Sequence, residues 1–536
     1  MTTGKCVRLL ALPWLLCSSL GCFGAEQYKK ISRESMADVV DGKHDAAVRG
    51  AESYLKDHPQ DLESLYVLAV AHAGKGDIKT SLSYVKKAVE GGLPFERFQA
   101  GPRELLRPLH ESDAFGQLAR KHGSRLLHGP LLGCVTDCSA RFWVRTADEA
   151  PVRVEVRAAG ASAHEVRKAA GKTRRENDFT TVLAVEGLRP DTRYEYTLRV
   201  EGQTETVKSQ FTTFHRPGRP ARITIGFGGG AGYTPQHEHM WNTVVSWKPT
   251  AFLFLGDNVY IDNPTRQAVQ QYCYYRRQSR PEYRNFTAGT PIYAIWDDHD
   301  FTTDDGWGGP DIDVPEWKIP VWHTFRNNWN NPYYAGGEKQ PGCWFDFSIA
   351  DVDFFMLDGR YYRVKGRRQR VEVDNPSMLG QAQKKWLFEK LRKAKGTFKV
   401  LASPVPWASG AKPGRGGMDT WEGFKEERAE IFSFLARHKI DGVVLISADR
   451  HRSDAWKIER PSGYPLYEFE SSRLTNIHTH GIMTGSLFGY NKKCSFGLLS
   501  FDTTAPDPTV TYRVINIDSV VMHTLVLRKS QLTHDK

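Results

Sequence analysis

The sequence predicts a multidomain α+β protein, because three consecutive stretches of its 536 residues carry three different residue patterns. Residues 31–121 place apolar side chains three and four positions apart, which is the spacing of helices. Residues 126–213 alternate apolar and polar positions between turn residues, which indicates short antiparallel strands. From residue 220 onward, apolar strand-like runs alternate with amphipathic helices, which is typical of an α/β domain. A chain of this length also exceeds what one hydrophobic core usually organises.

The composition indicates folded domains and favours anionic partners. Hydrophobic residues make up 40% of the chain and aromatic residues 12%, which is enough to bury cores and excludes a disordered chain. The 73 Lys and Arg residues outnumber the 62 Asp and Glu residues, so the net charge is +11. No block of like charges and no basic helix with interleaved aromatic residues occurs, so we expect no nucleic-acid partner.

The N-terminus has the layout of a secretory signal peptide over residues 1–25. Lys5 and Arg8 precede an apolar run at residues 9–17, which is followed by small residues. This run is too short to span a bilayer, and no later stretch reaches the ~20 apolar residues that a transmembrane helix needs. We therefore expect an exported protein, periplasmic or extracellular, with no transmembrane span after the signal.

Two forms of the mature N-terminus are open. Cleavage after Gly24 would place small residues, Cys22 and Gly24, at the two recognition positions. Alternatively, the protein is lipid-anchored through Cys22, because Ser19–Cys22 loosely resembles a lipobox.

The cysteines beyond the signal do not form a disulfide framework. They are odd in number, widely spaced and without a CxxC pair, which also argues against a zinc knuckle or redox centre. We expect buried small side chains or one incidental bridge among Cys134, Cys138, Cys273, Cys343 and Cys494.

The helical segment, residues 26–125, resembles a tetratricopeptide (TPR) array. Apolar and small residues fall at the repeat spacing, and Gly76-Asp77 stands at the turn between two helices. The match amounts to one repeat and part of another, whereas about three repeats are needed for an independent solenoid. The helices are therefore expected to pack on a neighbouring domain or on a protein partner; a plain helical spacer is the alternative. The matching positions are Leu65, Leu68, Ala69, Gly76 and Ala88.

Residues 126–215 predict a small β-sandwich. Ala140–Arg145 and Val152–Val156 alternate as half-buried strands do. Leu188–Tyr196 has the turn followed by an aromatic strand that is typical of fibronectin type III modules, including a tyrosine corner. Paired Pro and Gly in His215–Pro220 then mark a linker.

The remaining domain, residues 220–531, predicts strands that end abruptly in polar residues. Thr250–Leu255 ends in Gly-Asp and Val443–Ile446 ends in Ser-Ala-Asp, while Leu379–Ala394 and Trp421–His438 are amphipathic helices. Loops at the carboxyl ends of such strands converge on one edge of the sheet, where layered α/β enzymes keep their chemistry.

The first polar cluster follows the strand at Thr250–Leu255. Gly256 allows a sharp turn, which places the carboxylate of Asp257 at the strand edge with Tyr260 three residues further on. Oxygen donors suit a hard cation, and a phenolate is a good ligand for ferric iron. A structural turn is the alternative explanation.

The second cluster, Asp297-Asp298-His299-Asp300, follows the apolar stretch Pro291–Ile295. Three carboxylates around one histidine repel one another unless a cation or several donors compensate them. One carboxylate would ligate a metal, and His299 could bond a substrate oxygen or protonate a leaving alkoxide. A solvated acidic loop is the alternative.

The third cluster contains Asp449 and His451, two residues apart where a strand ends. This spacing on an extended backbone puts both side chains on one side, which suits two adjacent metal ligands. His237 and His239 have the same spacing, but they lie in a polar loop and are expected to be solvated.

Together the three clusters resemble the metallophosphoesterase superfamily, and specifically the PhoD-like alkaline phosphatases. The likeness runs over residues 126–531, and residues 356–363, 379–387 and 421–428 carry further matching motifs. It implies a four-layer α/β/β/α catalytic domain over residues 220–531, preceded by the β-sandwich that such proteins carry.

The resemblance also implies roles for individual residues. His299 and Asp298 would be catalytic, with His299 assisting the phosphate or the leaving group. Arg450 or Arg452 could neutralise phosphate oxygens, and at least one of the two is expected on the surface. The implied cofactors are metal ions, Fe(3+) and Ca(2+). Asp257 would bridge the metals, Tyr260 would bind ferric iron, Asp298 would take the second metal, and Asp449 and His451 match the last metal motif.

The chain departs from the family at the first motif. The family usually has Phe-Gly-Ser-Cys, with the cysteine as an iron ligand, whereas this chain has Phe227–Gly230. Gly230 cannot bind a metal through a side chain, so the metal identity and the activity itself are open. A glycine-rich turn could instead let backbone amides approach an anion, or His237 or His239 could reach the site.

The resemblance implies an exported metal-dependent phosphoesterase. It would hydrolyse phosphomonoesters or phosphodiesters, with a metal-bound hydroxide as the nucleophile. Phospholipase-D-like cleavage of lipid diesters is a second reading within the same family. The alternative from another class is a binding protein: a catalytically degenerate scaffold that docks a partner on its TPR-like helices.

Overall fold

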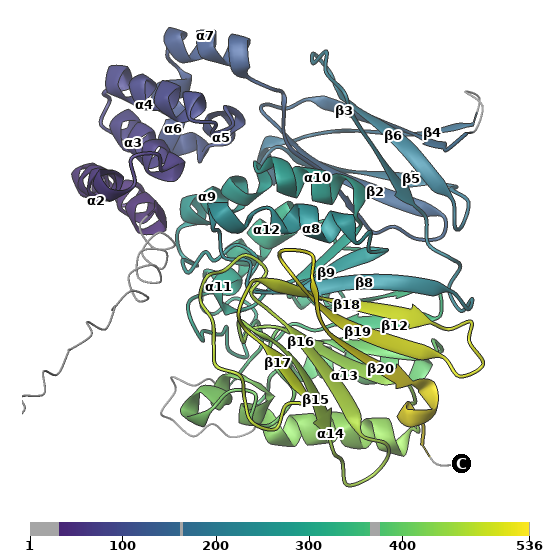
Figure 1. Ribbon diagram of the computed structural model, residues 1–536. Coiled ribbons are helices and arrows are strands. Elements are labelled where there is room, and N and C mark those ends of the chain that lie inside the picture. Colours follow the sequence, from purple (N-terminus) through teal and green to yellow (C-terminus); the bar gives the residue numbers. More distant parts are fainter. Residues whose placement is uncertain (1–31, 161–164, 365–375, 535–536) are drawn as a thin grey trace, which may run out of the picture.

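The computed structural model describes residues 32–160, 165–364 and 376–534. A helical segment and a β-sandwich lie beside each other against a larger domain built on two stacked sheets (Figure 1). The predicted signal peptide, its cleavage site after Gly24 and Cys22 lie outside the described residues. Among the described residues, no helix is long and apolar enough to cross a bilayer.

The N-terminal stretch is helical as predicted. Asp61 and Asp77 begin two of its helices by accepting hydrogen bonds from the backbone N–H groups of Ser64 (2.8 Å) and Thr80 (3.1 Å). The turn between those helices contains Gly76 with a φ of +77°, which confirms the predicted turn. The tetratricopeptide assignment stays a prediction. The helices span residues 32–40, α2 (His44–Asp57), α3 (Leu62–Gly74), α4 (Ile78–Glu90), α5 (Glu96–Ala100), α6 (Arg103–His110) and α7 (Asp113–His122).

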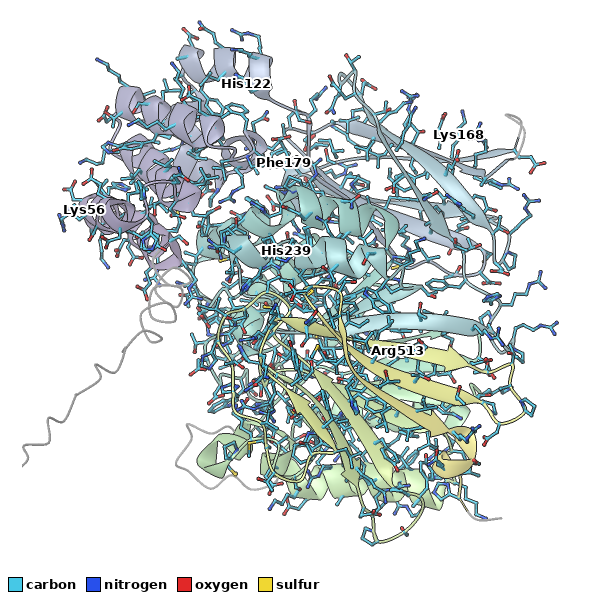
Figure 2. The ribbon with its side chains drawn as sticks, in the orientation of Figure 1. Lys56, His122, Lys168, Phe179, His239 and Arg513 are labelled. Carbon is cyan, nitrogen blue, oxygen red and sulfur yellow. The ribbon has the colours of Figure 1, made fainter. Side chains whose placement is uncertain are left out.

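The helical segment packs on the neighbouring domains, as expected for helices too few to form an independent repeat array. The buried Glu63 on α3 forms an ion pair with Arg97 (3.0 Å) and accepts a hydrogen bond from Tyr272 of the large domain (2.7 Å). On the sandwich side, the Arg103 guanidinium lies 4.0 Å from the ring centroid of Phe179. Figure 2 labels Phe179, which lies where the helices meet the sandwich.

The β-sandwich consists of a three-stranded sheet in the order β1-β2-β5 and a four-stranded sheet in the order β4-β3-β6-β7. Phe142 and Tyr196 join the two sheets with their ring centroids 4.7 Å apart. The Tyr194 hydroxyl accepts a hydrogen bond from the Arg189 N–H (2.8 Å), as a tyrosine corner does. The fibronectin-type assignment stays a prediction. The strands are β1 (Leu126–Gly133), β2 (Ser139–Thr146), β3 (Pro151–Ala158), β4 (Val166–Lys172), β5 (Thr180–Glu186), β6 (Arg193–Val200) and β7 (Val207–Thr212).

The large domain contains two mixed sheets, in the orders β10-β9-β8-β18-β19-β20 and β11-β12-β13-β14-β16-β15-β17. Strands β8, β9 and β10 are parallel, and so are β12, β13, β14 and β16. Their bounds are β8 (Arg222–Gly228), β9 (Ala251–Leu255), β10 (Ile292–Ile295), β11 (Phe345–Ile349), β12 (Val352–Met356), β13 (Phe398–Ala402), β14 (Val443–Ser447), β15 (Ser453–Ile458), β16 (Leu466–Ser471), β17 (Phe488–Tyr490), β18 (Ser495–Asp502), β19 (Thr509–Asn516) and β20 (Val521–Arg528).

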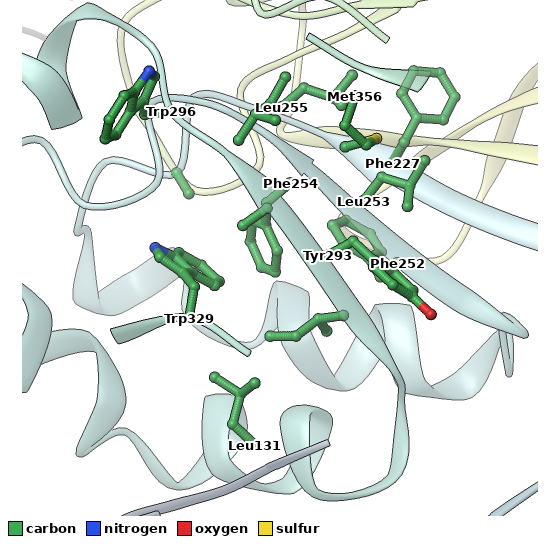
Figure 3. Close-up of a cluster of buried hydrophobic side chains, with 14 of the residues drawn as sticks. Leu131, Phe227, Phe252, Leu253, Phe254, Leu255, Tyr293, Trp296, Trp329 and Met356 are labelled. Carbon is green, nitrogen blue, oxygen red and sulfur yellow. The ribbon is translucent and has the colours of Figure 1, made fainter. Parts of the chain in front are cut away.

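The core lies between the two sheets. Phe469 of β16 stacks on Tyr512 of β19, with ring centroids 4.4 Å apart. Figure 3 shows Leu253 and Leu255 of β9 on the side of Met356, which belongs to the other sheet. Alternate residues of β9 point the other way, and Phe252 contacts Phe286 of a covering helix at 5.4 Å between centroids.

Helices cover both outer faces of this stack (Figure 1), which gives the expected order of helix, sheet, sheet and helix. The Phe424 backbone leaves the helical region, so the predicted helix at Trp421–His438 divides into a 3-10 turn at Trp421–Phe424 and the helix α14. On one side lie α8 (Met240–Ser246), α9 (Gln267–Gln278), α10 (Pro281–Gly289) and α12 (Lys318–Asn328), and on the other α13 (Gly380–Lys393) and α14 (Lys425–Arg437).

The cysteines behave as small side chains rather than as a framework. Within the described part of the chain none forms a disulfide, and Cys138 alone among them is exposed.

Candidate metal centre and active site

The three predicted polar clusters meet at the carboxyl ends of parallel strands. Asp298 and His299 begin the short helix α11 (Asp298–Phe301) after β10, and Asp449 and His451 follow β14. All four line one cavity of about 610 Å³. The tertiary fold therefore gathers clusters that lie about 150 residues apart in the chain.

Asp257 and Tyr260 lie next to this cavity with only 2% and 1% of their surfaces exposed. Both adopt left-handed backbone, with φ near +55° and +53°, and so do Asp449 (+69°) and His451 (+51°). Such residues cost about 1–3 kcal/mol each and cluster at functional sites. Gly256 is required where the two loops cross, because a Cβ there would lie 2.5 Å from the Cβ of Asp297.

Tyr260 connects the first cluster to the third. Its hydroxyl donates a hydrogen bond to Asp257 Oδ2 (2.8 Å) and lies 3.1 Å from His451 Nε2. The other ring nitrogen of His451, Nδ1, lies 3.1 Å from the carbonyl oxygen of His478, so it carries the proton. The lone pair of Nε2 is thereby directed at the Tyr260 oxygen, as in a histidine prepared to bind a metal.

Asp257 has the environment of a carboxylate that suits a cation. Its Oδ1 is buried and has no hydrogen-bond partner among the described residues. Burial raises the pKa of the Asp257 carboxyl well above its usual range, because a buried carboxylate charge is unfavourable without a compensating positive group. Ligand atoms of Asp257, Asp298 and His299 lie within 4.8 Å of one another. A carboxylate, a phenol and an imidazole around one point suit ferric iron or a divalent metal, so the residues present fit the implied metal centre.

Asp298 and His299 are held on the cavity side. Asp298 Oδ2 accepts a hydrogen bond from the Asp305 N–H (2.6 Å), and Oδ1 lies 3.8 Å from Arg360 Nη2. His299 Nδ1 bonds to Asp262, and the His299 ring stacks on Tyr260 with centroids 4.4 Å apart. Although burial lowers the pKa of His299, the surrounding carboxylates raise it well above its usual value.

The other two carboxylates of the second cluster support the loops instead. Asp300 accepts hydrogen bonds from the backbone N–H groups of Asn258 (2.8 Å) and Val259 (3.0 Å), which fixes the loop that carries Tyr260. Asp297 is paired with the fully buried Arg360. The acidic run is therefore not a solvated loop, because donors from three other segments compensate it.

Positive side chains form another part of the cavity wall. Asp449 Oδ2 lies 3.7 Å from Lys412 Nζ and 3.6 Å from Arg450 Nη1. Arg450 and Arg452 are both buried, so the expectation that one lies on the surface is not met. Arg452 points away from the cavity to Asp454 (2.6 Å), which leaves Arg450 as the candidate for a substrate anion.

The first motif is built around glycine. Gly230 has a φ of +65°, and a Cβ there would lie 2.8 Å from Ser472 Oγ. His237 Nδ1 lies 3.0 Å from the Thr475 carbonyl oxygen, and His239 is exposed, with Nδ1 2.9 Å from the Gln236 carbonyl oxygen. Neither histidine is among the described residues that line the cavity, so the expectation that one of them could reach the site is not met.

Sequence reasoning missed several residues of the site. His478 and His480 repeat the two-residue spacing of the third cluster after β16, so a pattern was present for them. Arg33 and Lys412 belong to no such pattern and reach the cavity only through tertiary contacts. The missed residues lining the cavity are Arg33, Asp262, Thr303, Asp304, Asp305, Lys412, Pro413, Gly416, His478 and His480.

Two family models match the chain. One is described as PhoD-like phosphatase and matches residues 225–495, which is just over half of the chain and includes every loop of the predicted clusters. The other is described as a domain of unknown function (DUF7800) and matches residues 123–216, the region of the β-sandwich.

Individual proteins point the same way. Alkaline phosphatase D of Bacillus subtilis (strain 168) is 22% identical over 320 residues, which cover 51% of this chain and 53% of that protein. The chain thus spans about half the length of this curated relative. A solved structure described as PhoD has a TM-score of 0.61 at 17% identity, covering 76% of this chain and 91% of the other. Purple acid phosphatase PPD1 from yellow lupin (Lupinus luteus) has a TM-score of 0.50 at 13% identity, covering 75% of each chain. With its polar loops gathered at one sheet edge and matched by the family model, this chain belongs to the PhoD-like phosphatase family.

Proposed function

We propose that this protein is an exported, metal-dependent phosphoesterase that hydrolyses phosphomonoesters or phosphodiesters. The observation that carries the proposal is the contact of Tyr260 with both Asp257 Oδ2 and His451, beside a second Asp257 oxygen, Oδ1, that is buried and has no hydrogen-bond partner among the described residues. Membership of a phosphatase family supports the reaction class. Export rests on the signal-like pattern of residues 1–25, which lie outside the described residues.

The metal ions would be held by side chains from all three clusters. A phenolate and an imidazole favour Fe(3+) near Tyr260 and His451, and carboxylates favour Ca(2+) or another divalent ion near Asp298 and Asp449. When bound, the ions supply the positive charge that attack on an anionic ester requires, together with an acidified water. Gly230 adds no thiolate to this set, so we propose an iron site without a sulfur ligand.

The protein's own residues then bind the substrate and move a proton. Arg450 and Lys412 present positive charge to the cavity, where they can hold phosphoryl oxygens. His299 Nδ1 is engaged by Asp262, so Nε2 is the nitrogen that can protonate the leaving oxygen. The backbone of Asp305 holds the Asp298 carboxylate next to His299.

The test combines elemental analysis of the purified protein with an esterase assay. We expect bound iron and a divalent metal, turnover of an aryl phosphate, and loss of both turnover and metal in Asp257→Ala. The matched control is Asp502→Ala, which removes a carboxylate paired with Arg222 (2.8 Å) on a distant strand and should leave both unchanged. Full turnover in Asp257→Ala would refute the proposal. Monoester, diester and phospholipid substrates compared side by side identify the substrate class.

One observation favours a second function. The first motif has Gly230 where the family resemblance implies a metal-binding cysteine, and such a change is expected in a catalytically degenerate scaffold. Such a scaffold would use the outer faces of its helical segment to bind a protein partner. Metal-poor protein without turnover on any of the three substrate classes would favour this alternative.

A further inference from the structure

The helical segment contributes a side chain to the candidate active site. Arg33 belongs to the first described helix, residues 32–40, and lines the cavity together with Asp298 and His299. Its Nη1 donates a hydrogen bond to the carbonyl oxygen of Tyr260 (2.9 Å) and forms an ion pair with Asp262 Oδ2. Only 12% of the Arg33 side chain is exposed, so this is an interior contact rather than a surface pair.

Asp262 contacts both Arg33 and His299. One carboxylate oxygen, Oδ2, faces Arg33, and the other, Oδ1, bonds to His299 Nδ1. The loop that carries Asp262 also bonds to the His299 backbone. The N–H groups of Ile261 (2.7 Å) and Asp262 (3.1 Å) donate hydrogen bonds to the carbonyl oxygen of His299. Arg33, Asp262 and His299 therefore form one continuous chain of contacts between the helical segment and the cavity.

We propose that Arg33 is a positioning residue that acts through Asp262 to hold His299 for proton transfer to the leaving oxygen, so that the helical segment completes the active site. A carboxylate on Nδ1 fixes the tautomer and the ring orientation of a histidine, and a guanidinium fixes that carboxylate in turn. Even a small displacement of a reacting group lowers the reaction rate strongly, so the contacts that hold the His299 ring in place should affect the rate. The inference rests on the phosphoesterase function proposed above.

Neighbouring contacts hold the helix in this position. Ser32 Oγ accepts a hydrogen bond from Arg276 (3.1 Å), and Asp41 pairs with Arg266 (2.7 Å) just beyond the other end of the helix. Arg266 offers a matched control, because it also joins this segment to the large domain but does not line the cavity. Loss of the Arg266 pair tests docking alone, whereas loss of Arg33 tests docking together with support of His299.

The proposed step predicts a dependence on the leaving group. The water oxygen bonds to phosphorus and the ester P–O bond breaks. The leaving oxygen takes the proton of His299 Nε2, and the proton released by the attacking water then reprotonates Nε2. A basic alkoxide needs this proton in the transition state, whereas p-nitrophenolate leaves without it. Support of His299 should therefore matter for alkyl phosphates and little for p-nitrophenyl phosphate.

The experiment measures kcat and KM on a propyl and a p-nitrophenyl phosphate for the full-length wild type, Arg33→Met, Arg33→Lys and Arg266→Met. We expect Arg33→Met to lower kcat on the alkyl ester by about ten-fold or more, against about two-fold or less on the aryl ester. Arg33→Lys should recover part of the loss, and Arg266→Met should leave both rates unchanged. Metal content and thermal midpoint, measured on every variant, separate loss of positioning from loss of metal or fold.

Two results would overturn the inference. Equal losses on the two esters in Arg33→Met would mean a purely structural contact, and wild-type rates on both would mean no role at all. If the wild type itself hydrolyses neither ester nor a diester, the proposed function is wrong and this inference falls with it. Failure of the proposed function is distinguishable from failure of this inference, because only the former shows as an inactive wild-type protein.

Discussion

Tyr260 and His451 are 191 residues apart in the chain, yet the phenol oxygen of one lies 3.1 Å from Nε2 of the other. Each sits in left-handed backbone just beyond a parallel strand, and the two strands belong to different sheets. The contact therefore joins the two halves of the large domain at the edge where the candidate metal centre lies.

Removal of the phenol oxygen tests this contact most directly. If Tyr260 binds iron as proposed, we expect Tyr260→Phe to weaken iron binding and to keep the ring stacked on His299, because only the proposed ligand oxygen is removed. Elemental analysis and loss of any visible ferric-phenolate absorption measure the effect. Tyr333→Phe is the matched control, since it removes an exposed hydroxyl that bonds to Asp346. Unchanged iron content in Tyr260→Phe would contradict the assignment.

Removal of metal should destabilise the protein as well as inactivate it. A cation that compensates Asp257 and Asp298 binds the folded state only, so chelation should lower the thermal midpoint and readdition should restore it. Scanning calorimetry with and without chelator measures the shift, and Asp257→Asn should make the protein less sensitive to chelation. A thermal midpoint that is indifferent to chelator would count against a resident metal.

The glycine at position 230 should resist replacement by the cysteine that the family resemblance implies there. Gly230 has positive φ and a Cβ would meet Ser472 Oγ at 2.8 Å, so we expect Gly230→Cys to cost about 1–3 kcal/mol and to gain no iron. Gly218→Ala is the control, because Gly218 also has positive φ but nothing lies within 4 Å of its Cβ position. Chemical unfolding of Gly230→Ala and Gly218→Ala separates crowding from backbone strain. Equal costs for the two alanine variants would show that Ser472 does not crowd the position.

The two arginines of the third cluster should separate binding from stability. Arg450→Met should raise KM for a phosphate ester with little change in the thermal midpoint, because Arg450 faces the cavity. Arg452→Met should instead destabilise by about 3–5 kcal/mol, because Asp454 and Glu470 would be left buried without their cation. Steady-state kinetics and thermal unfolding of both variants measure the difference. The reverse pattern would mean that Arg452 serves the substrate.

Local residue patterns were sufficient to predict the elements that frame the site. The apolar run predicted at Thr250–Leu255 is β9 at Ala251–Leu255, and the run predicted at Val443–Ile446 is β14 at Val443–Ser447. The periodicity of a strand shows which of its side chains are buried, and a glycine or acidic residue directly after it marks where the strand ends. Both signals are local, so they can be recognised in the sequence without knowledge of the tertiary fold. The same reasoning marked Asp257, Tyr260, Asp298, His299 and His451 as candidates, and these side chains do meet.

The sequence by itself determined where strands end, which oxygen and nitrogen donors follow them, and that the first motif has no thiolate. Only the tertiary structure decided which of those donors touch, that Asp297 and Asp300 support loops, and that Arg33 enters the site from another segment through Asp262, 229 residues away. The reason is physical: periodicity reports how each stretch buries its own side chains, whereas contacts across segments depend on how already folded elements dock.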